Sequence, residues 1–210
     1  MAVVTNRSSA DRVIIENVSW GTYEAFLKDL ENRSSPRLAF DQGVLEIMSP
    51  HLEHERAKQA LATIVEIVLE ELDLDFENAG STTFKREALK RGFEPDSCFY
   101  IQNVARIRHK TRIDMDVDSP PDLVIEVDLM KSSLNKFPLY AALGIPEIWR
   151  YEGALEMWVL DQTGYGRRGS SAALPLLNEK LISELLESGR AVKRPNWLRQ
   201  TRERIRGLLR

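Results

Sequence analysis

Cysteine is nearly absent from this 210-residue sequence, which contains Cys98 and no other. A single cysteine excludes an internal disulfide framework, and three histidines without further cysteines do not make a zinc site. No apolar run approaches the roughly 20 residues that are needed to cross a bilayer. The N-terminus also has no basic region followed by an apolar segment, so no export signal is expected. These absences predict a cytoplasmic protein with no membrane partner.

The composition of the chain is that of a globular protein. Hydrophobic residues make up 43% and charged residues 29% of the sequence, a balance that supports a packed core. The length is near the upper end of what usually remains one domain. We expect residues 1–10 to be disordered, residues 11–190 to form a single domain, and residues 191–210 to form a basic C-terminal helix.

Charge is distributed unevenly along the sequence. The formal net charge is −3, but residues 190–210 contain eight basic residues and one acid, which leaves about −10 on the rest of the chain. Such a tail can contact nucleic-acid phosphates, or it can form a solvated helix face whose charges pair with the acidic body. The candidate phosphate contacts are Arg194, Arg199, Arg202 and Arg206.

Apolar spacing predicts that helices and strands alternate along the chain. Helices are expected at 20–30, 50–72 and 138–143, and strands at 37–40, 44–48, 97–101, 123–129, 145–151 and 155–160, with one or two short strands within 76–84. Residues 102–119 are expected to form a loop. This order predicts an α/β protein with a mixed central sheet flanked by helices.

The run at 123–129 has an acidic side. Side chains two residues apart share one face of a strand, so Asp122, Glu126 and Asp128 are expected on the face opposite Leu123 and its apolar neighbours. Carboxylates without a base among them repel one another unless a cation is present. Asp96, before the preceding strand, could reach the same ion. Carboxylate oxygens are suitable ligands for Mg²⁺ or Mn²⁺. The alternative to a metal site is an acidic strand face that is exposed to solvent.

Several short motifs resemble a known family when they are taken in order. They are GVLEIMSP at 43–50 with His54, Pro95-Asp96, PDLVIEV at 121–127, Lys136 before Tyr140, and GIPEIW at 144–149. Their order and spacing resemble the Uma2 (DUF820) family of restriction-like endonucleases. The resemblance implies a PD-(D/E)XK nuclease core, with a mixed sheet of about four strands and an active site on two neighbouring strands.

The resemblance also assigns roles to residues. Asp96 matches the first acid of the family, Glu126 the second, and Lys136 a lysine that lies on the following segment. Asp122 stands at the Pro-Asp step before the second acid. Asp128 occupies the position where a standard E-x-K motif has lysine, which puts the identity of the catalytic lysine in doubt. Pro138 favours a helix that begins near it rather than one that contains Lys136.

These residue types suit phosphodiester hydrolysis. Asp96 and Glu126 would hold Mg²⁺ or Mn²⁺, with Asp122 or Asp128 as an outer or alternative ligand, and DNA as the substrate. Lys136 would orient the water or stabilise charge on the phosphate. On the long helix, His54 faces the predicted sheet and Glu55 flanks it. Both are secondary candidates, with a neutral packed histidine and a first-turn acid as the alternatives.

Three hypotheses about function follow from the sequence. The first is an active Mg²⁺-dependent DNA endonuclease, and the second is a catalytically inactive nuclease fold that acts as a binding or regulatory module. The third is hydrolysis of another bond, such as a glycosidic bond, by a carboxylate pair. Nucleases that cut both strands commonly dimerise, so a homodimer is expected by analogy.

Overall fold

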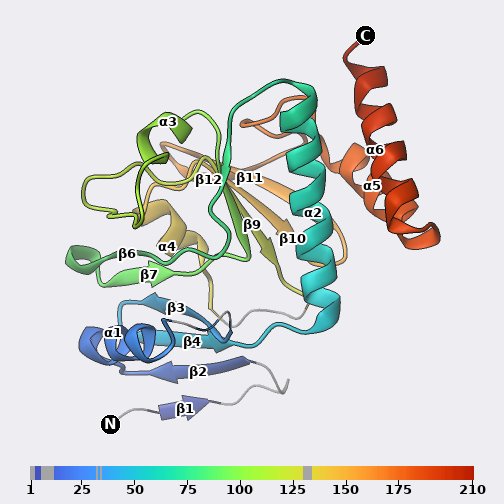
Figure 1. Cartoon of the computed structure of the whole chain (residues 1–210). Helices are drawn as coiled ribbons and strands as arrows, with labels where there is room; N and C mark the ends of the chain where they lie inside the picture. The colour runs from blue at the N-terminus through green and yellow to red at the C-terminus, as the bar shows by residue number, and fades with distance from the viewer. Residues whose placement is uncertain (1–2, 6–11, 32, 34, 130–133) are drawn as a thin grey trace.

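The computed structural model describes residues 3–5, 12–31, 33, 35–129 and 134–210 (Figure 1). Within the segment expected to be disordered, residues 1–10, the structure describes a short strand, β1 (Val3–Thr5), and the other positions lie outside the described residues. The strands form two sheets, where the sequence indicated one. No helix of the described residues is long and apolar enough to cross a membrane.

The first sheet has the strand order β1-β2-β4-β3-β7-β6, and all of its recorded pairs are antiparallel. Its remaining strands are β2 (Arg12–Glu16), β3 (Arg37–Asp41), β4 (Val44–Met48), β6 (Phe84–Arg86) and β7 (Arg91–Phe93). β3 and β4, at the predicted strands 37–40 and 44–48, form an antiparallel hairpin. Its turn consists of Gln42 and Gly43, both at positive φ (48° and 101°), and glycine adopts this conformation without steric cost.

The second sheet is mixed, with the order β12-β11-β10-β9-β8-β5. Its strands are β5 (Glu77–Asn78), β8 (Ser97–Tyr100), β9 (Leu123–Val127), β10 (Glu147–Tyr151), β11 (Leu155–Asp161) and β12 (Gly164–Arg168). β9 and β10 are parallel, and the other recorded pairs are antiparallel. The predicted strands at 97–101, 123–129, 145–151 and 155–160 are therefore confirmed, whereas β12 was not predicted.

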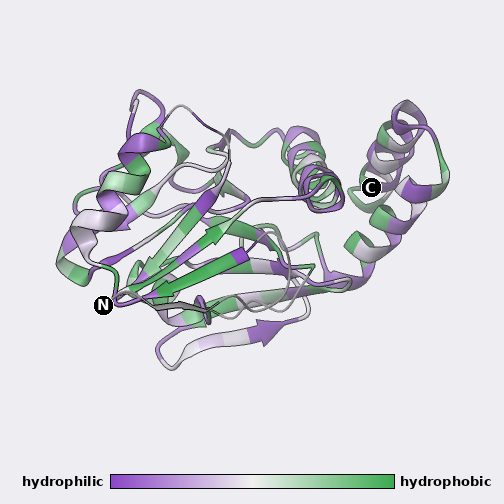
Figure 2. Cartoon of the chain, turned by 90° about the horizontal axis from the view of Figure 1, so that it is seen from below, coloured by the Kyte–Doolittle hydropathy of each residue, from purple (hydrophilic) through white to green (hydrophobic). Residues whose placement is uncertain are grey.

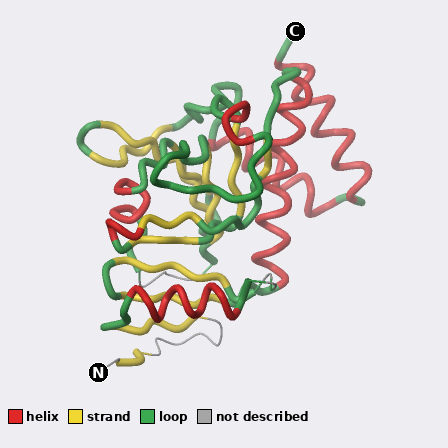
Figure 3. Tube along the Cα trace, turned by 60° about the vertical axis from the view of Figure 1, so that its left-hand side comes forward, coloured by secondary structure: helices red, strands yellow, loops and turns green. Residues whose placement is uncertain are grey.

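The helices are α1 (Trp20–Asp29), α2 (Leu52–Glu71), a 3-10 turn (Glu87–Leu89), α3 (Val104–Ile107), α4 (Phe137–Ala142), α5 (Glu179–Ala191) and α6 (Arg194–Leu208). Ser19 caps α1 by accepting a hydrogen bond from the Thr22 amide. The segment 102–119 is not wholly a loop, because α3 lies within it. Helices α2, α5 and α6 gather on one side of the molecule, beside the mixed sheet (Figure 3).

The core of the mixed sheet shows why β9 positions a site. Leu123, Ile125 and Val127 pack into the cluster that contains the buried side of α2, whereas Val124 packs into the cluster on the other face. Hydrophobic residues concentrate in the strands at the middle of the molecule (Figure 2). Because side chains alternate along a strand, Glu126 shares the face of Val124 and points away from α2.

Candidate active site

Asp96 and Glu126 come from neighbouring strands of the mixed sheet. Asp96 directly precedes β8, and Glu126 lies in β9. The antiparallel register sets Ser97 opposite Ile125, and Asp96 and Glu126 are the next residues along the two chains. The Val127 amide donates to Asp96 Oδ2 at 2.7 Å, which fixes the aspartate against the end of β9. The two acids that the sequence singled out are therefore brought together.

Asp96 is almost fully buried, with 2% of its surface exposed, and cationic or polar donors surround it. Arg37, in β3, donates to Oδ1, and His54 Nε2 lies 3.0 Å from Oδ2. Burial by itself would raise the pKa of the Asp96 carboxyl, but His54, Arg37 and the Val127 amide outweigh it and hold the pKa below its ordinary value. Asp96 is thus an ionised carboxylate at neutral pH.

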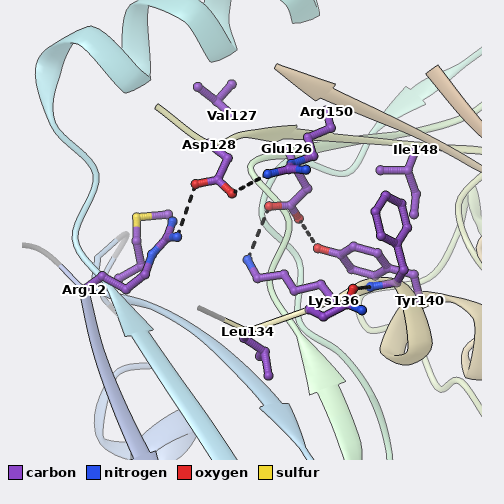
Figure 4. A pocket seen from close by; sticks show the side chains of 12 residues that line it. Arg12, Glu126, Val127, Asp128, Leu134, Lys136, Tyr140, Ile148 and Arg150 are labelled. Atoms are coloured by element: carbon purple, nitrogen blue, oxygen red, sulfur yellow. Dashed lines mark hydrogen bonds and ion pairs between the residues drawn. The ribbon is translucent and has the colours of Figure 1, made fainter. Parts of the chain in front are cut away.

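Glu126 has a different environment. Tyr140 Oη donates to Oε1 at 2.7 Å, and Lys136 Nζ lies 3.5 Å from Oε2 (Figure 4). Burial raises the pKa of the Glu126 carboxyl, and the nearby Asp96 charge adds to this, whereas Lys136 and Tyr140 act in the opposite direction. The net effect is a raised pKa, so Glu126 holds a proton more readily than an exposed glutamate.

Lys136 lies at the start of α4, in the N-cap position, and Pro138 lies in the first turn. Its ammonium group bridges two carboxylates, at 3.2 Å from Glu46 Oε1 and 3.5 Å from Glu126 Oε2. Burial alone would lower the pKa of Lys136, but Glu126 and Glu46 outweigh it and raise the pKa. Lys136 therefore remains a cation inside the site.

Two further residues support this arrangement. Glu46, in β4, is 1% exposed and was not singled out by sequence reasoning, although an acid inside the apolar strand VLEIM is a signal of a buried partner. Tyr140 follows Lys136 by four residues and so shares its helix face. Burial, together with Glu126, raises the pKa of Tyr140 well above its ordinary value, so the phenol remains a hydrogen-bond donor.

The other two acids expected on the face of β9 have partners of their own. Asp128 pairs with Arg12 at 3.2 Å and Arg150 at 3.5 Å (Figure 4). Asp122 lies at the opposite end of the strand, where it accepts hydrogen bonds from the amides of Ile101 (2.7 Å) and Asn103 (3.1 Å) and from the Asn103 side chain (2.7 Å). The expected row of three acids is therefore divided, because Asp122 satisfies backbone amides away from Glu126.

Both secondary candidates on α2 lie beside Asp96. His54 is 7% exposed and faces Asp96, as its place on the helix stripe suggested. Glu55 pairs with Lys58 at 2.5 Å and with Arg37 at 3.3 Å. Since Arg37 contacts both Glu55 and Asp96, it links the first turn of α2 to the acid before β8.

The basic tail divides into two groups. Arg202 pairs with Glu70 and Arg206 with Glu71, each at 2.7 Å, so these two arginines bind acids of α2. Arg194 donates to Thr63 Oγ1 at 2.9 Å, and Arg199 donates to Asn196 at 2.6 Å. The expected ion pairing between the tail and the acidic body is thus found for Arg202 and Arg206.

A cavity of about 270 Å³ opens beside Glu126. Its lining combines charged groups with an apolar wall, as Figure 4 shows for several of these side chains. The lining residues are Arg12, Met48, Glu126, Val127, Asp128, Leu134, Asn135, Lys136, Phe137, Tyr140, Ile148 and Arg150. Glu126 and Lys136 are therefore reachable from this cavity, although both lie deep in the fold.

The donor set fits a hard divalent cation. A carboxylate oxygen has two lone pairs, and Glu126 Oε1 and Oε2 each accept from one side chain, Tyr140 and Lys136 respectively. Each oxygen therefore retains an acceptor position. Mg²⁺ is commonly held by one or two carboxylates and keeps several waters, so Asp96 with Glu126 is a sufficient pair. In the described part of the chain, no group of three or more His, Cys, Asp or Glu side chains is arranged to hold a metal by itself.

Comparisons with known proteins identify the family and the fold of the chain. The Uma2 family model, described as "Putative restriction endonuclease", matches residues 22–191, and no curated protein matches the chain. A solved structure described as "a putative nuclease belonging to DUF820", from Anabaena variabilis ATCC 29413, is similar with a TM-score of 0.55 at 13% identity, over 80% of this chain and 99% of that one. This likeness shows the restriction-endonuclease-like fold. Because the family model matches more than half of the sequence, the chain belongs to the Uma2 family.

Proposed function

We propose that the chain is a metal-dependent endonuclease that hydrolyses DNA phosphodiester bonds. One observation carries the proposal: Asp96, directly before β8, accepts a hydrogen bond from the amide of Val127, the residue after Glu126 in β9, and the Lys136 ammonium lies 3.5 Å from Glu126. Two acids that can hold a metal ion, with a cation beside them, are groups that can support hydrolysis of a phosphodiester bond. The family description and the fold of the similar nuclease support the same assignment.

Each residue of the site has a role in this proposal. Asp96 and Glu126 would hold Mg²⁺ or Mn²⁺, which lowers the pKa of a bound water and neutralises charge on the scissile phosphate. Lys136 places a point cation beside Glu126, where it can stabilise charge that develops on the phosphate. Tyr140 orients Glu126 through its 2.7 Å hydrogen bond. Arg37 and His54 hold the Asp96 carboxylate in place.

Cleavage of plasmid and linear DNA with Mg²⁺, Mn²⁺ or EDTA tests the proposal. We expect cleavage with either metal and none with EDTA, which also separates this chemistry from a carboxylate pair that works without metal. Glu126→Gln should lower the rate by at least about 100-fold, as expected for loss of a group that acts in the transition state. Glu77→Gln, on the edge strand β5, removes an exposed acid and serves as the matched control.

A second candidate function is a catalytically inactive nuclease fold that binds DNA. It is favoured by the donors that already engage both carboxylates, namely Arg37 and His54 at Asp96 and Lys136 and Tyr140 at Glu126. In that case the internal cations would take the place of the metal ion as counter-charges. DNA binding without cleavage in Mg²⁺ or Mn²⁺, on both single-stranded and duplex substrates, would support this alternative and overturn the first proposal.

A further inference from the structure

The described residues also form a second concavity, of about 920 Å³. We call it the arginine groove. Three elements enclose it: the first turns of α2, the turn between β10 and β11 at Gly153, and the junction of α5 with α6. Three guanidinium groups, those of Arg56, Arg190 and Arg194, line it. None of these elements supplies the carboxylates of the proposed metal site, so the groove is a separate feature.

The fold holds the three arginines in different ways. Arg194 stacks over the Trp197 ring, with 5.2 Å to the centroid, and donates to Thr63 Oγ1. Arg190 donates to Tyr151 Oη at 3.3 Å and pairs with Glu187 on the surface. Such an exposed pair contributes only about 0–1 kcal/mol, so a phosphate can compete for Arg190. Arg56 is exposed at the start of α2.

Two acids, Glu53 and Glu55, also line the groove. Glu55 is largely compensated, because it pairs with Lys58 at 2.5 Å and with Arg37 at 3.3 Å. Arg37 also pairs with Asp96, so it connects Glu55 to the Asp96 carboxylate. The groove is therefore linked to the buried Asp96 carboxylate through Glu55 and Arg37.

The size and lining of the groove favour one strand of nucleic acid. A volume of about 920 Å³ is close to the upper limit of small-ligand pockets, about 1,000 Å³, which leaves room for a short stretch of one strand. Tyr151 and Trp197 are buried under the arginines, at 7% and 3% exposure, so phosphates and not bases would make the contacts.

We propose that the arginine groove binds the phosphate backbone of single-stranded DNA. The inference rests on the proposed function, because it names the form of substrate that this nuclease site receives. Contacts to phosphates carry no sequence information, so binding along the groove is independent of base sequence.

The test is the salt dependence of binding, measured by fluorescence anisotropy with a labelled single-stranded oligonucleotide in Ca²⁺. Each lost phosphate contact flattens the slope of log affinity against log salt by about 0.7 for a single strand. The triple variant Arg56→Gln, Arg190→Gln and Arg194→Gln should therefore lower the slope by about 2. The matched control, with the same change in charge outside the groove, is Arg168→Gln, Arg204→Gln and Arg210→Gln, and its slope should equal that of the wild type.

Arg194 and Arg190 also contact Thr63 and Tyr151, so the triple variant is checked by circular dichroism and thermal unfolding. Arg56→Gln alone, at an exposed position, should lower the slope by about 0.7 and provides the fold-safe measurement. Equal slopes for the groove and control variants, or a slope change seen only with duplex DNA, would overturn the inference. The binding readout does not depend on cleavage, so a wild type that binds with the expected slope and never cuts would refute only the nuclease proposal.

Discussion

Lys136 Nζ lies 3.2 Å from Oε1 of Glu46, which belongs to β4 in the antiparallel sheet and is 1% exposed. Glu46 is therefore a positioning residue for the lysine. Glu46→Gln removes one of the charges that keep Lys136 protonated and fixed next to Glu126. We expect kcat to fall about tenfold, the equivalent of one pKa unit of lost stabilisation, with little change in KM. Glu16→Gln, an exposed acid at the end of β2, is the control.

A change in KM with no change in kcat would contradict this role, because it would assign Glu46 to substrate binding. Lys136→Met and Lys136→Arg make the interpretation sharper. Methionine retains much of the volume and loses the charge, so its activity should be the lower of the two if the cation is what matters.

The buried ion pair between Arg37 and Asp96 predicts a large effect on stability. Both side chains are at most 6% exposed, and Arg37→Met leaves the Asp96 carboxylate without its cation in the interior. Breaking a buried pair by removing one partner typically costs about 3–5 kcal/mol. We expect a loss of that order in the free energy of unfolding, measured by urea denaturation. Arg37→Met combined with Asp96→Asn should recover part of it, and a double variant no more stable than Arg37→Met would refute the pairing.

Metal binding should stabilise the folded state, independently of any cleavage. If Asp96 and Glu126 hold Mg²⁺, the ion binds the native state alone and raises its stability by mass action, by about 2.7 kcal/mol when the ion is at 100 times its dissociation constant. Thermal unfolding with and without MgCl₂ measures this effect. The stabilisation should be absent in Glu126→Gln and present in Glu77→Gln. If the thermal unfolding midpoint of the wild type is the same with and without Mg²⁺ or Mn²⁺, the metal site is contradicted.

The sequence predicted the local features of the fold well. Leu123 to Val127 alternates between the two cores as its period-2 pattern indicated, and Pro138 lies in the first turn of α4 as its backbone preference requires. These features depend on residues close in the chain. The division of the strands into two sheets depends on pairings far apart in the sequence, such as β3 with β7, for which no local pattern exists.

The candidate site could be predicted only in part for the same reason. Asp96 and Glu126 were found from their acidic type and their strands, and Lys136 from its place in the family pattern. Glu46 and Arg37 were missed, because each acts on a residue that is distant in the sequence. Asp122 was grouped with Glu126 because the alternation was extended beyond the strand, which begins at Leu123. Asp122 lies before the strand, and its carboxylate accepts hydrogen bonds from backbone amides of the loop after β8.

The charge of the basic tail, residues 190–210, suggested that it binds DNA. Arg202 and Arg206 pair with Glu70 and Glu71 of α2, and their side chains are 39% and 59% exposed. Exposed pairs contribute about 0–1 kcal/mol each, so Arg202→Gln with Arg206→Gln should lower the free energy of unfolding by at most about 2 kcal/mol. The salt slope of DNA binding should stay at the wild-type value, because these guanidinium groups bind acids and not phosphates. Each lost phosphate contact flattens the slope by about 0.7–0.9. A slope that flattens by nearly 2 in this variant would therefore show that both arginines contact DNA phosphates.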